Sequence, residues 1–193
     1  MAILSLWRAW PRARPSRQPR RIGAIAALVC LAVSVRFATG GPLKDDLDEY
    51  QVKAAFLYNF AKFVQWPSKD GPSHIVIGIV GDDPLGDVLD QIVRGKTVDG
   101  RELVVRRLRP DDDPRLCQIL FVSSSEARRT PDLLMRLQAS GVLTVGEAPH
   151  FLREGGVIRF YVEDSRVRFE ISLQGAAHAG IRISSQLLSL ASH

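Results

Sequence analysis

Apolar residues follow two different spacings along this chain, and each spacing predicts a type of secondary structure. From Asp48, a residue suited to cap a helix, apolar positions recur at helical spacing to about Trp66, and Pro67 interrupts the pattern. They form two stripes, so the predicted helix has a wide apolar arc to bury against more than one neighbour. Either it packs on a sheet as a core helix, or part of its aromatic surface meets a second chain.

In the middle of the chain, β-branched runs alternate with further helical patterns. Such runs are typical of strands buried on both faces, and strands separated by helices favour parallel pairing. The predicted strands cover residues 74–80, 101–107, 118–123 and 141–145, and the predicted helices between them cover residues 85–93 and 131–140.

Near the C-terminus the pattern becomes antiparallel. Val157–Val162 and Val167–Leu173 have alternating apolar residues and flank the polar turn Glu163–Arg166, which predicts a β-hairpin. After a stretch of small residues, an apolar helix is predicted from Ile181 to Leu190. Residues 41–193 are therefore predicted to form a single α/β domain, with a mixed, mostly parallel sheet flanked by helices on both faces and a C-terminal β-hairpin and helix.

The first forty residues have the pattern of an export signal. Several arginines precede the apolar run Ile22–Val35, and Ala38-Thr39-Gly40 supplies the small residues of a cleavage site. The apolar run is shorter than the roughly 20 residues that a membrane-spanning helix needs, which favours cleavage over an uncleaved anchor. We expect residues 1–40 to be a cleaved signal peptide and the remainder to be periplasmic.

This segment also determines the charge of the chain. The whole sequence has 26 Lys and Arg, 21 Asp and Glu and a net charge of +5. Seven of the basic residues lie in the first forty, where there is no acid, so 19 bases and 21 acids leave residues 41–193 with a net charge of −2. This part has no basic stripe with interleaved aromatic residues, which excludes a nucleic-acid-binding protein.

No motif for catalysis, for a cofactor or for a metal is evident. The turn at Gly81-Asp82-Asp83-Pro84 follows a predicted strand, but its acids would repel a phosphate, so Asp82 and Asp83 are expected to cap the next helix. No histidine has the spacing of a zinc ligand, and Ser123-Ser124-Ser125 lacks the Gly-x-Ser-x-Gly elbow of a serine hydrolase. We therefore expect no enzyme, with an unrecognised activity as an alternative.

The sequence leaves two structural roles open for each of two residues, Cys117 and Glu170. Once the signal is removed, Cys117 is the only cysteine, so it either packs in the core or pairs with a cysteine of another chain. Glu170 alternates with Phe169 and Ile171 in the last predicted strand. It is either a solvent-facing strand residue or a partly buried carboxylate paired with a base, for which Arg168, Arg182 and Lys53 are the candidates.

Six motifs together resemble the YfiR family of secreted bacterial regulators. The resemblance spans about Tyr50 to Ala191. The motifs are Lys53–Pro67 (KAAFLYNFAKFVQWP), Gly81–Pro84, Cys117–Glu126 (CQILFVSSSE), Val142–Glu147 (VLTVGE), Val167–Ile171 (VRFEI) and Ile183–Leu188 (ISSQLL).

The resemblance implies a periplasmic negative regulator. Such a protein binds the periplasmic sensor region of a membrane diguanylate cyclase and lowers the synthesis of cyclic di-GMP. The alternative function is that of a periplasmic small-molecule-binding protein. A homodimer is a further alternative. In the family a cysteine often stands opposite the one that matches Cys117, but here Gly78 occupies that place, so the family's disulfide is not available. The hairpin and the last helix are the expected interface. Its candidate residues are Phe169, Glu170, Ile171, Leu173, Ile183 and Leu187.

Overall fold

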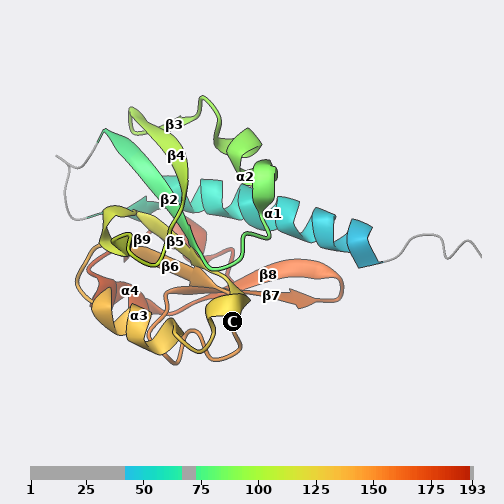
Figure 1. The fold of residues 1–193 in the computed structure, drawn as a ribbon. Helices are drawn as coiled ribbons and strands as arrows, with labels where there is room; N and C mark the ends of the chain where they lie inside the picture. Colours follow the sequence, from blue (N-terminus) through green and yellow to red (C-terminus); the bar gives the residue numbers. More distant parts are fainter. Residues whose placement is uncertain (1–41, 67–72, 192–193) are drawn as a thin grey trace, which may run out of the picture. The chain divides into compact units, whose positions relative to one another are not determined.

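A seven-stranded sheet forms the centre of the fold in a computed structural model that describes residues 42–66 and 73–191 (Figure 1). The predicted signal peptide lies outside the described residues. The sheet order is β3-β4-β2-β5-β6-β7-β8. Its strands are β2 (His74–Val80), β3 (Thr97–Val98), β4 (Arg101–Arg107), β5 (Ile119–Val122), β6 (Leu143–Gly146), β7 (Ile158–Glu163) and β8 (Arg166–Ile171).

The inner strands are parallel and the edge strands are antiparallel, which confirms the predicted mixed, mostly parallel sheet. β4, β2, β5, β6 and β7 pair in parallel, whereas β3 and β8 pair antiparallel with their neighbours. The strands predicted at residues 74–80 and 101–107 coincide with β2 and β4. β2 is a run of β-branched residues with both faces largely covered, whereas β4 has a short apolar centre, Leu103–Val105, between charged residues.

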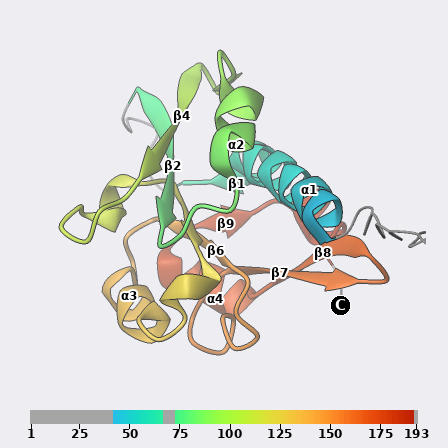
Figure 2. The ribbon, with the colours of Figure 1, turned by 45° about the vertical axis from the view of Figure 1, so that its right-hand side comes forward.

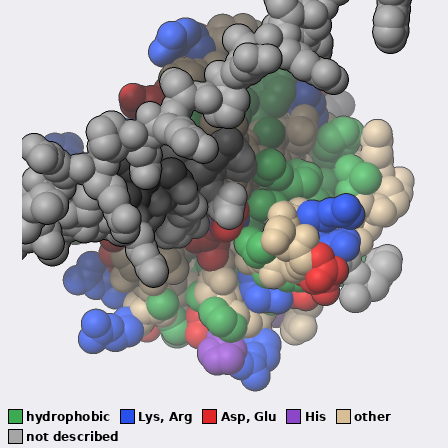
Figure 3. All heavy atoms as spheres, turned by 90° about the vertical axis from the view of Figure 1, so that its right-hand side faces the viewer, with side chains coloured by type: hydrophobic (Ala, Val, Ile, Leu, Met, Phe, Trp, Pro, Cys, Tyr) green, Lys and Arg blue, Asp and Glu red, His purple; other side chains and the backbone are tan. Residues whose placement is uncertain are grey.

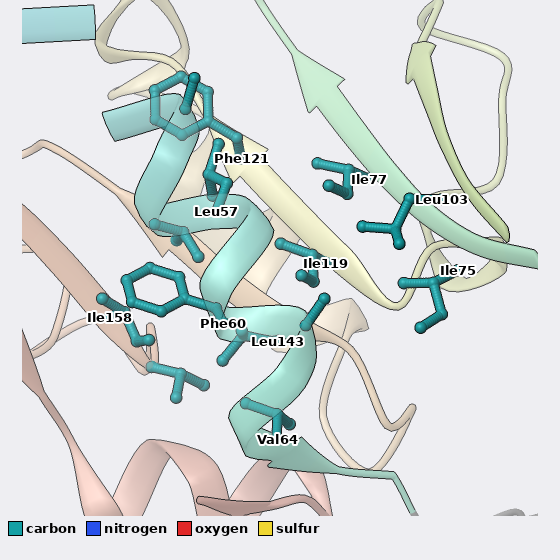
Figure 4. Packing of buried hydrophobic residues seen from close by; sticks show 14 of the residues in the cluster. Leu57, Phe60, Val64, Ile75, Ile77, Leu103, Ile119, Phe121, Leu143 and Ile158 are labelled. Carbon is teal, nitrogen blue, oxygen red and sulfur yellow. The ribbon is translucent and has the colours of Figure 1, made fainter. Parts of the chain in front are cut away.

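Helices cover both faces of the sheet, as predicted (Figure 2). The helices are α1 (Pro42–Phe63), α2 (Gly86–Val93), α3 (Thr130–Arg136), α4 (Leu173–Ala179) and α5 (Ser185–Leu188), with short 3-10 turns at Pro114–Leu116 and Ser124–Glu126. α1 and α2 pack on one face and α3 on the other, and alternate residues of each strand enter the two cores. From α1, Leu57 lies beside Phe121 of β5 and Phe60 beside Ile158 of β7 (Figure 4).

α1 ends three residues earlier than the sequence predicted. Val64–Gln65 forms a short strand, β1, that pairs antiparallel with β9 (Arg182–Ile183). The Ser184 N–H also donates to the Phe63 carbonyl (2.9 Å). The predicted C-terminal end was too late because β9, a segment near the C-terminus, pairs with residues 64–65, and helical spacing cannot reveal such a partner. The helix also begins earlier than predicted, at Pro42 instead of Asp48.

The C-terminal segment also differs from the prediction. The small residues after the hairpin form α4, which Ser172 caps by accepting the Gly175 N–H (2.9 Å) and which Gly180 ends with a φ of 77°. The helix predicted from Ile181 is limited to Ser185–Leu188, because residues 182–183 are used as β9.

The predicted hairpin is confirmed, with a tighter turn. Only Asp164 and Ser165 lie between β7 and β8, and their φ values are 50° and 56°. Positive φ at both central residues is the geometry of a type I′ turn, whose twist matches that of the strands.

Candidate partner-binding surface

The hairpin extends beyond the rest of the sheet. β7 pairs with β6 only through Val145↔Ile158 and Gly146↔Arg159, so its residues 160–163 continue past the end of β6. α1 supports the base of this extension, since the Phe56 ring lies 6.0 Å from that of Phe160 and 5.2 Å from that of Phe169. An extended hairpin held rigidly at its base presents side chains to solvent on both faces and at its tip.

One face of the hairpin is charged. Arg159 and Glu170 are paired across the strands, with an Arg159 Nη2 to Glu170 Oε2 distance of 3.0 Å. Closer to the tip, Arg168 and Glu163 form a second ion pair at 2.7 Å. The Arg159 guanidinium also lies 5.0 Å from the centre of the Tyr161 ring. Alternation along both strands places these side chains on the same face.

Glu170 is thus a partly buried, paired carboxylate, but its partner is none of the predicted bases. Arg168 pairs with Glu163, Lys53 pairs with glutamates elsewhere, and Arg159 lies directly opposite Glu170 in the antiparallel register. The two-residue turn sets this register. The sequence contained that signal, because a two-residue loop at Asp164-Ser165 pairs residue 159 with residue 170.

The other predicted interface residues fall into two groups. Phe169 and Leu187 are each 2% exposed and belong to the core, so they support the surface residues from the interior of the protein. Ile171 and Ile183 are half-buried, and Leu173 is exposed at the start of α4. Ile183 pairs with Val64, which brings the last strand to the end of α1, away from the hairpin tip.

An apolar groove between α1 and the hairpin tip was not predicted. It has a volume of about 620 Å³, and Val52 and Val162 in its walls are 44% and 50% exposed. Figure 3 views this side of the molecule and shows hydrophobic side chains gathered beside charged ones. The groove is lined by Glu49, Val52, Phe56, Val162, Ser165, Arg166 and Val167. Only the tertiary packing of the helix against the hairpin brings these two segments together.

A buried ion cluster positions the helical wall of this groove. Lys53 is 3% exposed, and its Nζ donates hydrogen bonds to Glu49 one turn earlier and to Glu147, which follows β6. It also lies 4.4 Å from the centre of the Tyr50 ring. Burial alone lowers the pKa of Lys53, but the hydrogen bonds to Glu147 and Glu49 outweigh it and hold the pKa above its ordinary value. Lys53 is therefore charged and links α1 to the sheet.

The acidic turn after β2 has a structural role. Asp83 Oδ1 accepts the N–H groups of Leu85 and Gly86, both at 3.0 Å, and Oδ2 accepts Arg107 Nε at 2.8 Å. Asp83 therefore caps the turn that leads into α2 and the first N–H of the helix, although the N-cap residue itself is Leu85, which makes no side-chain capping bond. Asp82 instead donates its backbone N–H to Ser125 Oγ (2.9 Å). Among residues 42–66 and 73–191, no group of three or more His, Cys, Asp or Glu side chains could hold a metal ion.

Cys117 is a core residue. It is 1% exposed, and burial raises the pKa of its thiol to about 11, which disfavours both the reactive thiolate and pairing with another chain. Gly78 lies against it: a Cβ added at Gly78 would be 2.5 Å from Cys117 Sγ. The place where the family resemblance implies a second cysteine is thus beside Cys117 in space.

Comparison with protein-family models matches residues 50–192 to the YfiR/HmsC-like family. The matched range includes the whole seven-stranded sheet, the buried pair of Lys53 and Glu147, and the extended hairpin. Within the described residues, no helix has both the length and the apolar character needed to cross a bilayer. The chain therefore belongs to the YfiR/HmsC-like family, whose members are periplasmic regulators of diguanylate cyclase signalling.

Proposed function

We propose that this protein is a periplasmic negative regulator that binds the periplasmic sensor region of a membrane diguanylate cyclase and lowers the synthesis of cyclic di-GMP. Family membership supports this class of function. The structural observation that carries the proposal is the extended hairpin, which combines an exposed apolar groove with a charged opposite face. Glu49 and Arg166 stand beside the apolar residues of the groove, and protein interfaces commonly combine an apolar centre with a polar rim.

A regulator of this kind acts through differential binding and needs no catalytic group. If it binds the inactive conformation of the cyclase about 3 kcal/mol more tightly than the active one, the ratio of the two conformations shifts by roughly a hundredfold. The contact residues that we propose are Glu170, Ile171, Leu173 and Ile183, together with Val52 and Val162 of the groove.

The direct test is co-purification from membranes. The tagged protein should isolate a membrane protein that contains a diguanylate cyclase domain, and Val162→Asp should abolish this association because it places a charge in the apolar groove. Arg106→Asp is the control, since Arg106 is an exposed strand residue of β4, toward the other edge of the sheet. Recovery of a cyclase by Val162→Asp as efficient as by the wild type would remove the groove from the interface.

Glu170→Lys is expected to raise cyclic di-GMP in cells while the protein remains folded and abundant. Glu170 points away from the core beside Phe169, and reversing a charge at an interface typically costs several kcal/mol of binding, roughly 2–5 kcal/mol where the pair is desolvated. The measurement is the cellular cyclic di-GMP concentration, normalised to the amount of protein.

The control must separate a lost partner contact from the lost Arg159–Glu170 pair. The double variant Arg159→Glu with Glu170→Lys restores an ion pair across the same two strand positions with its polarity reversed. If Glu170 contacts the cyclase, the double variant remains defective. Full repression by the double variant would mean that Glu170 acts only by stabilising the hairpin. A truncation from Ile183 is less informative, because it also removes the buried Leu187.

A further inference from the structure

The order of the parallel strands changes direction between β2 and β5. After β2 the chain passes through α2 to β4 on one side, and after β4 it returns to β5 on the opposite side of β2. The connections that follow β2 and β5 therefore leave the carboxyl ends of adjacent strands in opposite directions. In open α/β sheets such a switch point creates a crevice, and ligands bind preferentially there.

A crevice is present at this position. It has a volume of about 330 Å³ and begins at Val80 and Gly81, where β2 ends. Leu108, which follows β4, and Leu133 of α3 contribute apolar side chains to its lining, and Glu126 comes from the turn that follows β5. This volume suits a small molecule with an apolar body.

Arginines surround the crevice. Arg109, Arg129 and Arg136 line it together with the acids Asp112 and Glu126, which gives a net positive charge in a domain whose overall charge is negative. The nearest ion-pair distances are long, 3.7 Å for Arg109 with Asp112 and 3.5 Å for Arg129 with Glu126, and both arginines are exposed. Such pairs contribute little free energy, so their guanidinium groups remain available to a ligand.

Arg136 is the most available of the three. It extends from the last turn of α3. Asp113 interacts with it electrostatically, but within the described part of the chain no carboxylate lies at ion-pair distance from it, and Asp113 is itself paired with Arg115. A guanidinium group presents several N–H donors in one plane, which match the oxygens of a carboxylate or a phosphate. The apolar lining and the arginines of the rim are thus complementary to a small molecule that has an apolar body at one end and a carboxylate or phosphate group at the other.

We propose that this crevice binds a small organic anion, with an apolar body against Val80, Leu108 and Leu133 and a carboxylate or phosphate group on Arg136 and Arg129. The crevice involves β2, β4, β5 and α3, whereas the proposed partner surface involves α1, β7 and β8. Binding of the anion therefore does not depend on the regulatory function, and the two proposals fail independently.

Titration calorimetry of the purified full-length protein tests this proposal. The probes are benzoate and phenyl phosphate, which distinguish a carboxylate from a phosphate on the same apolar body, and neutral benzamide is the matched control. We expect saturable binding of at least one anion, with benzamide at least about tenfold weaker, since hydrogen bonds to charged groups exceed the 1.4 kcal/mol that a tenfold change represents.

Substitutions locate the site. Arg136→Gln is expected to weaken binding of the anion about tenfold or more, and Arg129→Gln should act in the same direction. Arg128→Gln is the matched control, because Arg128 is equally exposed and adjacent in sequence but does not line the crevice. Each of these arginines is on the surface, so the variants should fold, and circular dichroism checks this. Equal binding of benzoate and benzamide, no binding of either anion at millimolar concentration, or unchanged affinity in Arg136→Gln would overturn the proposal.

Discussion

Replacing Lys53 by methionine is expected to lower the free energy of unfolding by about 3–5 kcal/mol, the usual effect of removing one partner from a buried ion pair. The Lys53 ammonium is buried between Glu49 and Glu147, and the Glu147 side chain is only 12% exposed. Without the lysine, Glu147 would be a buried carboxylate with no compensating charge. Urea denaturation followed by circular dichroism measures the change.

The same helix provides a matched control. Lys62 is exposed, donates to Asn59 Oδ1 at 3.0 Å and lies over the Tyr58 ring at 4.0 Å, so Lys62→Met should cost no more than about 1 kcal/mol. Adding Glu147→Gln to Lys53→Met should recover part of the lost stability, because it removes the uncompensated charge. A Lys53→Met protein as stable as Lys62→Met would show that the buried cluster contributes nothing net to folding.

The pH dependence of stability follows from the same cluster. Folding raises the pKa of Lys53 above its ordinary value of 10.5, so the folded state holds this proton more tightly than the unfolded chain does. The contribution of the pair is thus fully present below pH 10.5 and is lost as the pH rises through the folded-state pKa. The difference in unfolding free energy between wild type and Lys53→Met should shrink over that alkaline range.

Gly78→Cys is expected to form a disulfide with Cys117 under oxidising conditions. A Cβ at residue 78 would lie 3.4 Å from Cys117 Cβ, close to the separation of about 3.8 Å that disulfides adopt. Closing the chain between residues 78 and 117 should stabilise the oxidised protein by roughly 4 kcal/mol relative to the reduced form, according to the loop-entropy model. Thiol titration detects the bond, and thermal unfolding with and without reductant measures its effect.

Gly78→Ser separates the bond from the added bulk. A serine Cβ would make the same contacts, 2.5 Å from Cys117 Sγ and 3.0 Å from Leu120 Cδ1, without a bond to relieve them. We therefore expect Gly78→Ser to be destabilised and insensitive to reductant, as the reduced Gly78→Cys protein should be destabilised. Two free thiols in Gly78→Cys after oxidation would show that the backbones are held too rigidly to join.

The Cys117 site also allows a test of redox control in this fold. The wild-type protein has a single buried thiol here, whereas Gly78→Cys would introduce the dithiol that the family resemblance implies for other members. If the proposed repression of the cyclase became sensitive to reductant in the Gly78→Cys protein, the intrachain disulfide alone would be sufficient to add redox control to this fold.

The sequence by itself determined the elements whose signal is local. The β-branched run at residues 74–80 predicted β2, because an inner parallel strand is covered on both faces, and the shorter apolar run Leu103–Val105 predicted β4. The alternation around residues 163–166 predicted the hairpin, and the position of Asp83 before an apolar helix predicted its capping role. The interactions of the hairpin and of the Asp83 turn lie within a few residues, and a buried strand is recognisable from its own apolar residues even though its partner strands are distant.

Only the tertiary structure decided the features that depend on distant segments. The end of α1 is set by pairing with β9, and the helical wall of the groove is held by Lys53 and Glu147, which are 94 positions apart. Phe169 and Leu187 are apolar like Leu173, yet the first two are buried and the third is exposed. Spacing along the chain shows which side chains share a face, but it does not show what covers that face, because burial depends on elements that approach from elsewhere in the sequence.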